Sequence, residues 1–227
     1  MPSTILLRSI SAVDDKRIVL SNSHFARPHG VATWTKLRVA IRWSMRDSGA
    51  NLTGTPLFAV GICSGSTNIF GDATADHFVG VRTQVATWTR AAGPPVNYAI
   101  NPVQAGKMVG TTWTAFSATN WISGSGIVMA DATAGNRFCW FIDITKPTSY
   151  TIAGYHRNVT TAGDISFATF LAQAEVDAAS LTNHTTSNSG TVAVDEGTNG
   201  TLDHVNVSWN RTTPEIEISD LAVVRLS

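Results

Sequence analysis

The sequence predicts an all-β protein, built as a sandwich of two antiparallel sheets with at most one short helix. Short segments that alternate apolar and polar residues recur along the chain, separated by clusters of Gly, Pro, Asn, Asp and Ser. The segment 37–45 shows the alternation best, because a large apolar residue occupies every odd position while Arg38 and Arg42 share the other face. A chain of 227 residues can bury one full hydrophobic core, and no repeat or linker divides it. We therefore expect a single domain over residues 1–227.

The first part of the chain predicts short strands between turn-forming residues. Expected strands are 4–10, 17–20, 37–45, 57–63, 78–83, 85–90 and 96–100. The segment 57–63 is almost continuously apolar, which is typical of a strand buried on both faces. The stretch 21–33, with Pro28 and Gly30, is expected to be a loop.

The second part of the chain continues the strand pattern with one exception. Expected strands are 107–116, 126–129, 137–144, 150–156, 202–209 and a last strand from 216 onwards. The last strand needs a bulge near Ser219 and Asp220 to keep its apolar residues on one face. Apolar spacings of three and four predict an amphipathic helix over 167–181, with a strand over 165–171 as the alternative. A long polar loop is expected over 182–200.

Two of these segments resemble a known superfamily. The strand FVGVRT (78–83) and the closing strand EIEISDLAVVRL (215–226) together resemble the concanavalin A-like, laminin-G-type jelly roll. The resemblance implies a jelly-roll sandwich over most of the chain. That superfamily includes lectins, glycosidases, adhesion modules and virion subunits such as phage tail proteins, so the fold alone does not determine a function.

Charge and hydropathy exclude several functional classes. Sixteen basic and sixteen acidic residues balance, and no basic patch predicts binding to nucleic acid or to an anionic membrane. The longest apolar runs, such as 57–63 and 138–142, are too short to span a bilayer. The first residues do not form a secretory signal, so we expect synthesis in a cytoplasm without export by that route.

The low share of charged residues predicts assembly. Charged residues make up 14% of the chain, against roughly a quarter in ordinary soluble domains, and a weakly charged surface resists association poorly. The leading hypothesis is a non-enzymatic structural subunit of a phage or phage-like particle, such as a tail, fibre or capsid-decoration protein, located in the virion. Its partners would be copies of itself and other particle subunits. The alternative explanation of the composition is that Thr suits the solvated face of a strand.

Tryptophan and arginine supply the candidate binding residues. Trp34, Trp88, Trp113 and Trp121 lie among small or polar neighbours and are expected to form an exposed platform for a glycan or a neighbouring subunit. The other three of the seven tryptophans, Trp43, Trp140 and Trp209, are expected in the core. Arg38 and Arg42 are candidates for a charged contact with a partner, and exposure to water is the alternative. The second functional hypothesis is a lectin-like module that binds a glycan, for example on a host surface.

The sequence offers no strong catalytic or metal motif, and we expect neither a catalytic residue nor a metal or cofactor. Glu215, Glu217 and Asp220 support a weaker glycoside hydrolase hypothesis, since two nearby carboxyl groups can serve as nucleophile and acid. Their order and position differ from the Glu-x-Asp-x-x-Glu run of concanavalin-like β-glucanases. A calcium site at Asp72, Asp76 and His77 is a further alternative.

Two cysteines, Cys63 and Cys139, lie inside apolar strand-like segments. Their isolation predicts buried, reduced thiols rather than a metal site. A disulfide that links the two sheets is the alternative.

Overall fold

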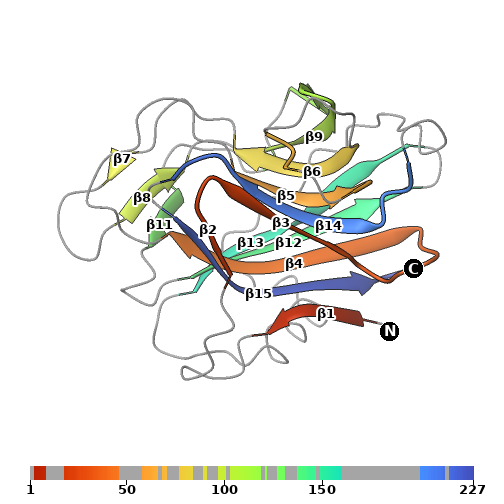
Figure 1. The fold of residues 1–227 in the computed structure, drawn as a ribbon, viewed down its shortest axis with the longest axis horizontal. Coiled ribbons are helices and arrows are strands. Elements are labelled where there is room, and N and C mark those ends of the chain that lie inside the picture. The colour runs from red at the N-terminus through yellow and green to blue at the C-terminus, as the bar shows by residue number, and fades with distance from the viewer. Residues whose placement is uncertain are drawn as a thin grey trace.

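Two antiparallel sheets packed face to face form the protein in a computed structural model (Figure 1). The structure describes residues 3–8, 18–45, 58–65, 68–70, 77–83, 89–90, 97–100, 103–118, 121, 127–130, 137–146, 149–159, 200–212 and 215–227. Every strand pair among these residues is antiparallel, and none of them lies in a helix. The predicted all-β sandwich is confirmed.

The first sheet has the strand order β1-β15-β4-β12-β13, with β2 also paired to β15. Its strands are β1 (Ser3–Arg8), β2 (Ile18–Leu20), β4 (Lys36–Met45), β12 (Arg137–Thr145), β13 (Thr151–Val159) and β15 (Ile216–Arg225). The first and last strands of the chain are therefore neighbours, and the two chain ends lie on the same side of the molecule (Figure 1).

The second sheet has the order β10-β9-β6-β5-β14-β3. Its strands are β3 (Ser23–Pro28), β5 (Phe58–Cys63), β6 (Phe78–Thr83), β9 (Val103–Val109), β10 (Thr112–Ala115) and β14 (His204–Trp209). A small third sheet, in the order β11-β8-β7, contains β7 (Thr89–Arg90), β8 (Asn97–Ile100) and β11 (Ile127–Ala130).

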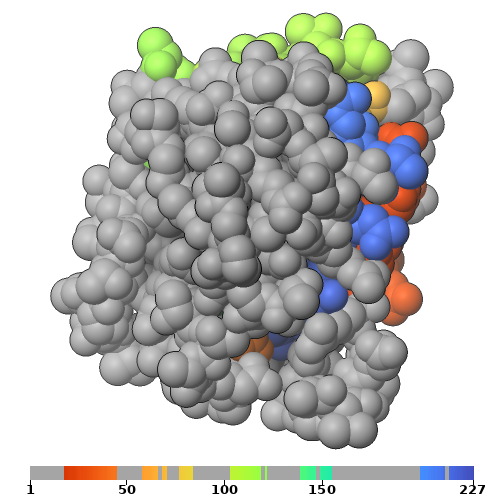
Figure 2. Space-filling view, turned by 90° about the vertical axis from the view of Figure 1, so that its left-hand side faces the viewer, coloured from red at the N-terminus to blue at the C-terminus, as the bar shows by residue number. Residues whose placement is uncertain are grey.

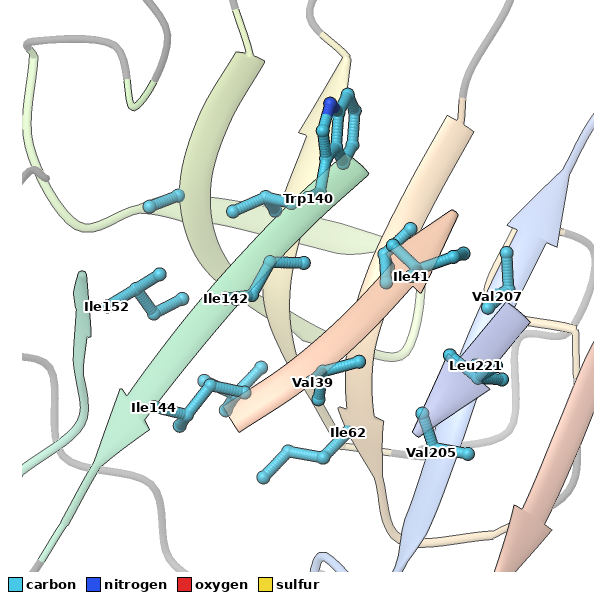
Figure 3. Packing of buried hydrophobic residues seen from close by; sticks show 14 of the residues in the cluster. Val39, Ile41, Ile62, Trp140, Ile142, Ile144, Ile152, Val205, Val207 and Leu221 are labelled. Carbon is cyan, nitrogen blue, oxygen red and sulfur yellow. The ribbon is translucent and has the colours of Figure 1, made fainter. Parts of the chain in front are cut away.

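The inner faces of the two large sheets meet in one hydrophobic core. Side chains from β4, β12 and β13 point towards those of β5 and β14 (Figure 3). Trp43, Trp140 and Trp209 are fully buried in this core, as predicted. The Trp43 ring lies 4.2 Å from Phe58 and 5.0 Å from Trp140, centroid to centroid, so aromatic contacts join the two sheets.

Several predicted strands are confirmed with their faces. In β4 the odd residues from Leu37 to Trp43 face the core and have no exposed surface. Strand β5 is buried at every position, as its continuous apolar run predicts. The expected bulge in the last strand lies between Ile218 and Asp220, where the register with β4 shifts.

Two predicted segments are wrong. The expected loop 21–33 contains strand β3, which pairs with β14 at the edge of the second sheet. An edge strand is half-buried and tolerates Pro28 at its end, so its sequence lacks the apolar alternation of a central strand. The expected strand 107–116 is a hairpin of β9 and β10 that turns at Gly110, whose φ of 55° lies in the left-handed region.

The remaining expectations fall partly outside the described residues. The predicted helix 167–181 and nearly all of the predicted loop 182–200 lie there, as do most residues of the expected strand 85–90. Among the residues that are described, no helix is long and apolar enough to cross a membrane.

Candidate functional site

The outer face of the first sheet carries the two arginines that were candidates for a partner contact. Arg38 is 6% exposed and Arg42 is 4% exposed, so neither the expected partner contact nor the water-facing alternative describes them. Arg38 donates from Nε to Oδ1 of Asp143 at 2.6 Å and from Nη2 to Oδ2 at 2.9 Å. Arg42 donates from Nε to Oδ2 of Asp220 at 2.5 Å. Both arginines therefore form ion pairs inside the protein.

The strand register explains these pairs. Arg38 lies directly opposite Asp143 on β12, and Arg42 lies directly opposite Asp220 on β15. Facing residues on neighbouring strands share one face of a sheet, so each guanidinium meets a carboxylate without leaving the sheet. A buried charge is tolerated only when it is paired in this way. These residues stabilise the sheet and leave little charge free for a ligand.

The four tryptophans of the expected platform are not together on the surface. Trp34 is 7% exposed and packs against Tyr150, while Trp121 has no exposed surface and packs against Trp140. The expected exposure of these two is wrong, because distant parts of the chain cover them. Trp88 lies outside the described residues. Trp113 is half-buried and keeps contact with solvent.

Trp113 lies on β10, on the outer face of the second sheet. Figure 2 shows the green segment 103–118, which includes β10, at the upper surface of the molecule. Directly opposite Trp113 on β9 lies Met108, which faces Phe78 on β6, and Trp113 packs against the hydrophobic cluster that these two residues belong to. The next row of residues on the same face is small: Ala115 faces Gly106 on β9, which faces Gly80 on β6, which faces Gly61 on β5. A Cβ at Gly106 would lie 2.5 Å from Cζ2 of Trp113, so the indole ring lies directly on the backbone of this glycine.

Two polar side chains hold the Trp113 ring from the neighbouring strands. Trp113 donates from Nε1 to Oε1 of Gln104 on β9 at 2.8 Å. The guanidinium carbon of Arg82, on β6, lies 4.4 Å from the centroid of the Trp113 ring. We call Arg82, Gln104 and Trp113 the Trp113 cluster.

Arg82 is the unusual member of the Trp113 cluster. Its side chain is half-buried, and its Nε is inaccessible to solvent and has no hydrogen-bond partner. Burial lowers the pKa of Arg82 to about 10, so the guanidinium remains charged at neutral pH. Among the described residues no carboxylate forms an ion pair with Arg82, in contrast to Arg38 and Arg42.

The carboxylates of the glycosidase hypothesis are placed differently from a free catalytic pair. Asp220 is fully buried and bound to Arg42, and Glu217 is 5% exposed on the same sheet face. Glu215 precedes β15 and is half-buried. A carboxylate that is already neutralised by an arginine is a poor nucleophile, so this face offers little support for two-carboxylate chemistry.

The candidate calcium ligands and the two cysteines can also be located in the structure. Across the described ranges no group of His, Cys, Asp and Glu is arranged to hold a metal ion; Asp72 and Asp76 lie outside those ranges, and His77 is buried. Cys63 and Cys139 are buried thiols that are not joined in a disulfide, which confirms the predicted reduced thiols. They lie on different sheets and on outer faces that point away from each other, so the alternative of a disulfide is wrong.

Sequence reasoning missed Arg82 and Gln104. Each is a large polar residue on the outward face of a mainly apolar strand, and each shares that face with glycine: Arg82 with Gly80, and Gln104 with Gly106. A large polar side chain beside glycine on one strand face is the signal that could have indicated this cluster. Its link to Trp113 depends on the strand order, which local patterns do not give.

No protein family model and no curated protein matches this chain. Solved structures with similar shape include the alginate lyase Aly36B in complex with alginate trisaccharide, at 12% identity and a TM-score of 0.43, over 99% of this chain and 88% of that chain. The calcium-bound exoplasmic/lumenal domain of VIP36 is 8% identical with a TM-score of 0.38, over 99% of this chain and 90% of that chain. An engineered GH43 glycoside hydrolase is 13% identical with a TM-score of 0.37, over 85% of this chain and 30% of that chain. With every TM-score below 0.5, a function for this chain must rest on its own residues.

Proposed function

We propose that the protein is a carbohydrate-binding module and that its ligand binds at the Trp113 cluster on the outer face of the second sheet. The observation that carries the proposal is Trp113 itself. It is the only predicted platform tryptophan with described exposure to solvent, and Gln104 and Arg82 hold its ring in place. The proposal includes no catalytic step.

The chemistry of the cluster suits a sugar. One face of a sugar ring is made of C–H groups that pack against an aromatic ring, while its hydroxyl groups need hydrogen-bond partners at the rim. The Trp113 cluster offers the half-buried aromatic ring together with the guanidinium of Arg82, while Gln104 is buried and fixes the ring through its hydrogen bond. A ring fixed before binding loses little conformational entropy when the ligand arrives.

A glycan array followed by titration calorimetry tests the proposal. We expect Trp113→Ala to weaken binding of any glycan hit by roughly tenfold or more, because a buried aromatic contact is lost. Thr114→Ala is the matched control, since Thr114 is the next residue of β10, is exposed and faces the opposite way. Trp113→Phe keeps an aromatic ring and separates loss of contact from loss of fold, which thermal melting checks.

Two results would contradict the proposal. One is an array without any bound glycan. The other is a glycan bound equally by wild type and by a folded Trp113→Ala variant.

Membership of a phage particle remains a prediction from the composition, with a charged share of 14% as its support. A glycan-binding module fits within such a particle, so the two hypotheses are compatible. Size measurement by light scattering tests assembly separately: a stable oligomer is expected, and a monomer at high concentration would contradict it.

A further inference from the structure

We infer that the Trp113 cluster selects an anionic carbohydrate, with the guanidinium of Arg82 as the group that binds the carboxylate or sulfate of the sugar. This inference rests on the proposed function and adds the chemical class of the ligand. The observation that carries it is the position of Arg82, which contacts the indole ring of Trp113 and remains partly exposed to solvent.

The first step is the missing partner of Arg82. Its Nε is buried without a hydrogen-bond acceptor, and a buried unsatisfied donor costs roughly 1–3 kcal/mol. Arginine cannot relieve this cost by losing its proton, because even the lowered pKa of about 10 leaves it charged at neutral pH. The half-buried guanidinium therefore keeps a charge that an anion can bind from the solvent side.

The second step is a comparison with the other arginines. Arg38 and Arg42 are more deeply buried than Arg82, and each is bound to a carboxylate of the same sheet. At these two positions the chain itself supplies the anion. Among the residues that the structure describes, no carboxylate pairs with Arg82, whose half-buried side chain still reaches solvent, so an external anion can take that place.

The third step is the orientation of the guanidinium. Stacking over Trp113 at 4.4 Å restricts the guanidinium plane, and Trp113 is itself fixed by Gln104. A restricted guanidinium presents its N–H donors as a planar fork, which matches the two oxygens of a carboxylate or sulfate. The ring that packs on the sugar and the group that binds its charge are thus in contact with each other.

The experiment measures binding of the purified full chain to matched glycans. The probes are oligouronates of several stereochemistries, their neutral methyl esters, and sulfated oligosaccharides of the same length. We expect binding of at least one acidic probe, and at least tenfold weaker binding of its neutral counterpart. For Arg82→Gln we expect a loss of roughly tenfold or more towards the acidic probe, and for Arg82→Lys a smaller loss, because charge remains without the fork.

Two other arginines provide matched controls. Arg27 is exposed on β3 and stacks over Phe25 at 5.4 Å, so Arg27→Gln removes the same charge and a similar contact elsewhere on this sheet. Arg211 also has a buried Nε without a partner but lies after β14, outside the cluster, so Arg211→Gln tests whether that feature binds the anion without the contact to Trp113. Both control variants should bind as wild type does.

A pH series separates the two sources of the anion. A uronate carboxyl group has a pKa near that of other carboxylic acids, so its binding should fall as the buffer becomes acidic through about pH 4. Binding of a sulfate ester should persist there. Added salt should weaken either interaction in wild type and much less in Arg82→Gln.

The outcomes distinguish this inference from the proposed function. Equal binding of acidic and neutral probes, or an unchanged affinity in folded Arg82→Gln, would overturn the anionic selectivity while Trp113-dependent binding stands. The absence of any Trp113-dependent glycan binding would overturn both.

Discussion

Arginine has contrasting surroundings on the two outer faces of the sandwich. On the first sheet, Arg38 and Arg42 are almost fully buried and each is bound to an aspartate on the neighbouring strand. On the second sheet, Arg82 is half-buried, stacks on Trp113 and has no carboxylate among the described residues. The first arrangement is a set of ion pairs inside the protein, and the second is the arrangement that we propose a ligand completes.

The difference shows what an arginine contributes beyond its charge. An ion pair that is complete inside the protein stabilises a strand register and is neutral to its surroundings. An arginine without an internal partner carries an unfavourable desolvation energy, which natural proteins commonly accept at functional sites. Breaking an ion pair of the first sheet should therefore lower the stability, whereas replacing Arg82 should weaken ligand binding without lowering the stability.

The largest expected effect is on the first sheet. Asp220→Ala leaves the guanidinium of Arg42 without the carboxylate that it binds at 2.5 Å. We expect the free energy of unfolding to fall by about 3–5 kcal/mol, because a buried charge loses its partner. Urea denaturation measures this change. The double variant Arg42→Met with Asp220→Leu should recover much of it, and a loss below about 1 kcal/mol in the single variant would show that the pair is not structural.

The second effect tests the close approach of backbone atoms at Gly80, on the sheet face that carries the Trp113 cluster. A Cβ at Gly80 would lie 2.3 Å from the carbonyl oxygen of Val60 and 2.7 Å from the Cα of Gly61. Gly80→Ala should lower the free energy of unfolding by about 1–3 kcal/mol, because backbone atoms must move apart. Ala26→Ser is the control on the half-buried edge strand β3 and should change the stability by less than about 0.5 kcal/mol. Denaturant titration of both variants decides, and equal stabilities would contradict the close approach.

A third, smaller effect contrasts the two kinds of arginine directly. Arg82→Met removes a buried Nε that has no partner, so the free energy of unfolding should stay within about 1 kcal/mol of wild type or rise. The same substitution at Arg42 should destabilise, since Asp220 then loses the guanidinium that it binds. Thermal and urea unfolding of the two single variants provide the test. A large loss at Arg82 would mean that this arginine is structural after all.

The smallest effect concerns a buried group that is kept neutral. His29 is 1% exposed, accepts a hydrogen bond at Nδ1 from the amide of Val31 and so donates from Nε2 to the carbonyl oxygen of Leu202. Burial lowers the pKa of His29 below its ordinary value of 6.5. The unfolded chain then binds a proton more readily than the folded protein does, so stability should fall as the pH drops below 6.5.

The decline at His29 is at most about 1.4 kcal/mol per pH unit for one group. Melting temperatures measured at a series of pH values test it. His29→Gln, which retains an acceptor and a donor, should show a flatter pH profile. An unchanged profile in that variant would exclude His29 as the source.

Local patterns predicted what depends on neighbours along the chain. The alternation in β4, the continuous burial of β5 and the bulge in β15 follow from side-chain periodicity, and all three could be predicted. Strand β3 was not predicted, because an edge strand carries polar residues and proline. The burial of Trp34 and Trp121 depends on Tyr150 and Trp140, which are remote in sequence.

The candidate site could be predicted only in part for the same reason. Trp113 was recognised as a binding candidate from its polar neighbours. Its partners Arg82 and Gln104 come from two other strands, and no periodicity indicates which strands lie side by side. The pairing of Arg42 with Asp220, separated by 178 residues, was hidden likewise.

The central place of β15 has a consequence for how the protein folds. This strand lies between β4 on one side and β1 with β2 on the other, so the first sheet cannot close before nearly the whole chain has been made. Contacts between residues so remote in sequence give a high contact order, and such proteins fold slowly because large loops must close first. Until β15 arrives, β4 has an unpaired edge that could bind another strand. Aggregation during synthesis would then begin at the edge that β15 later covers.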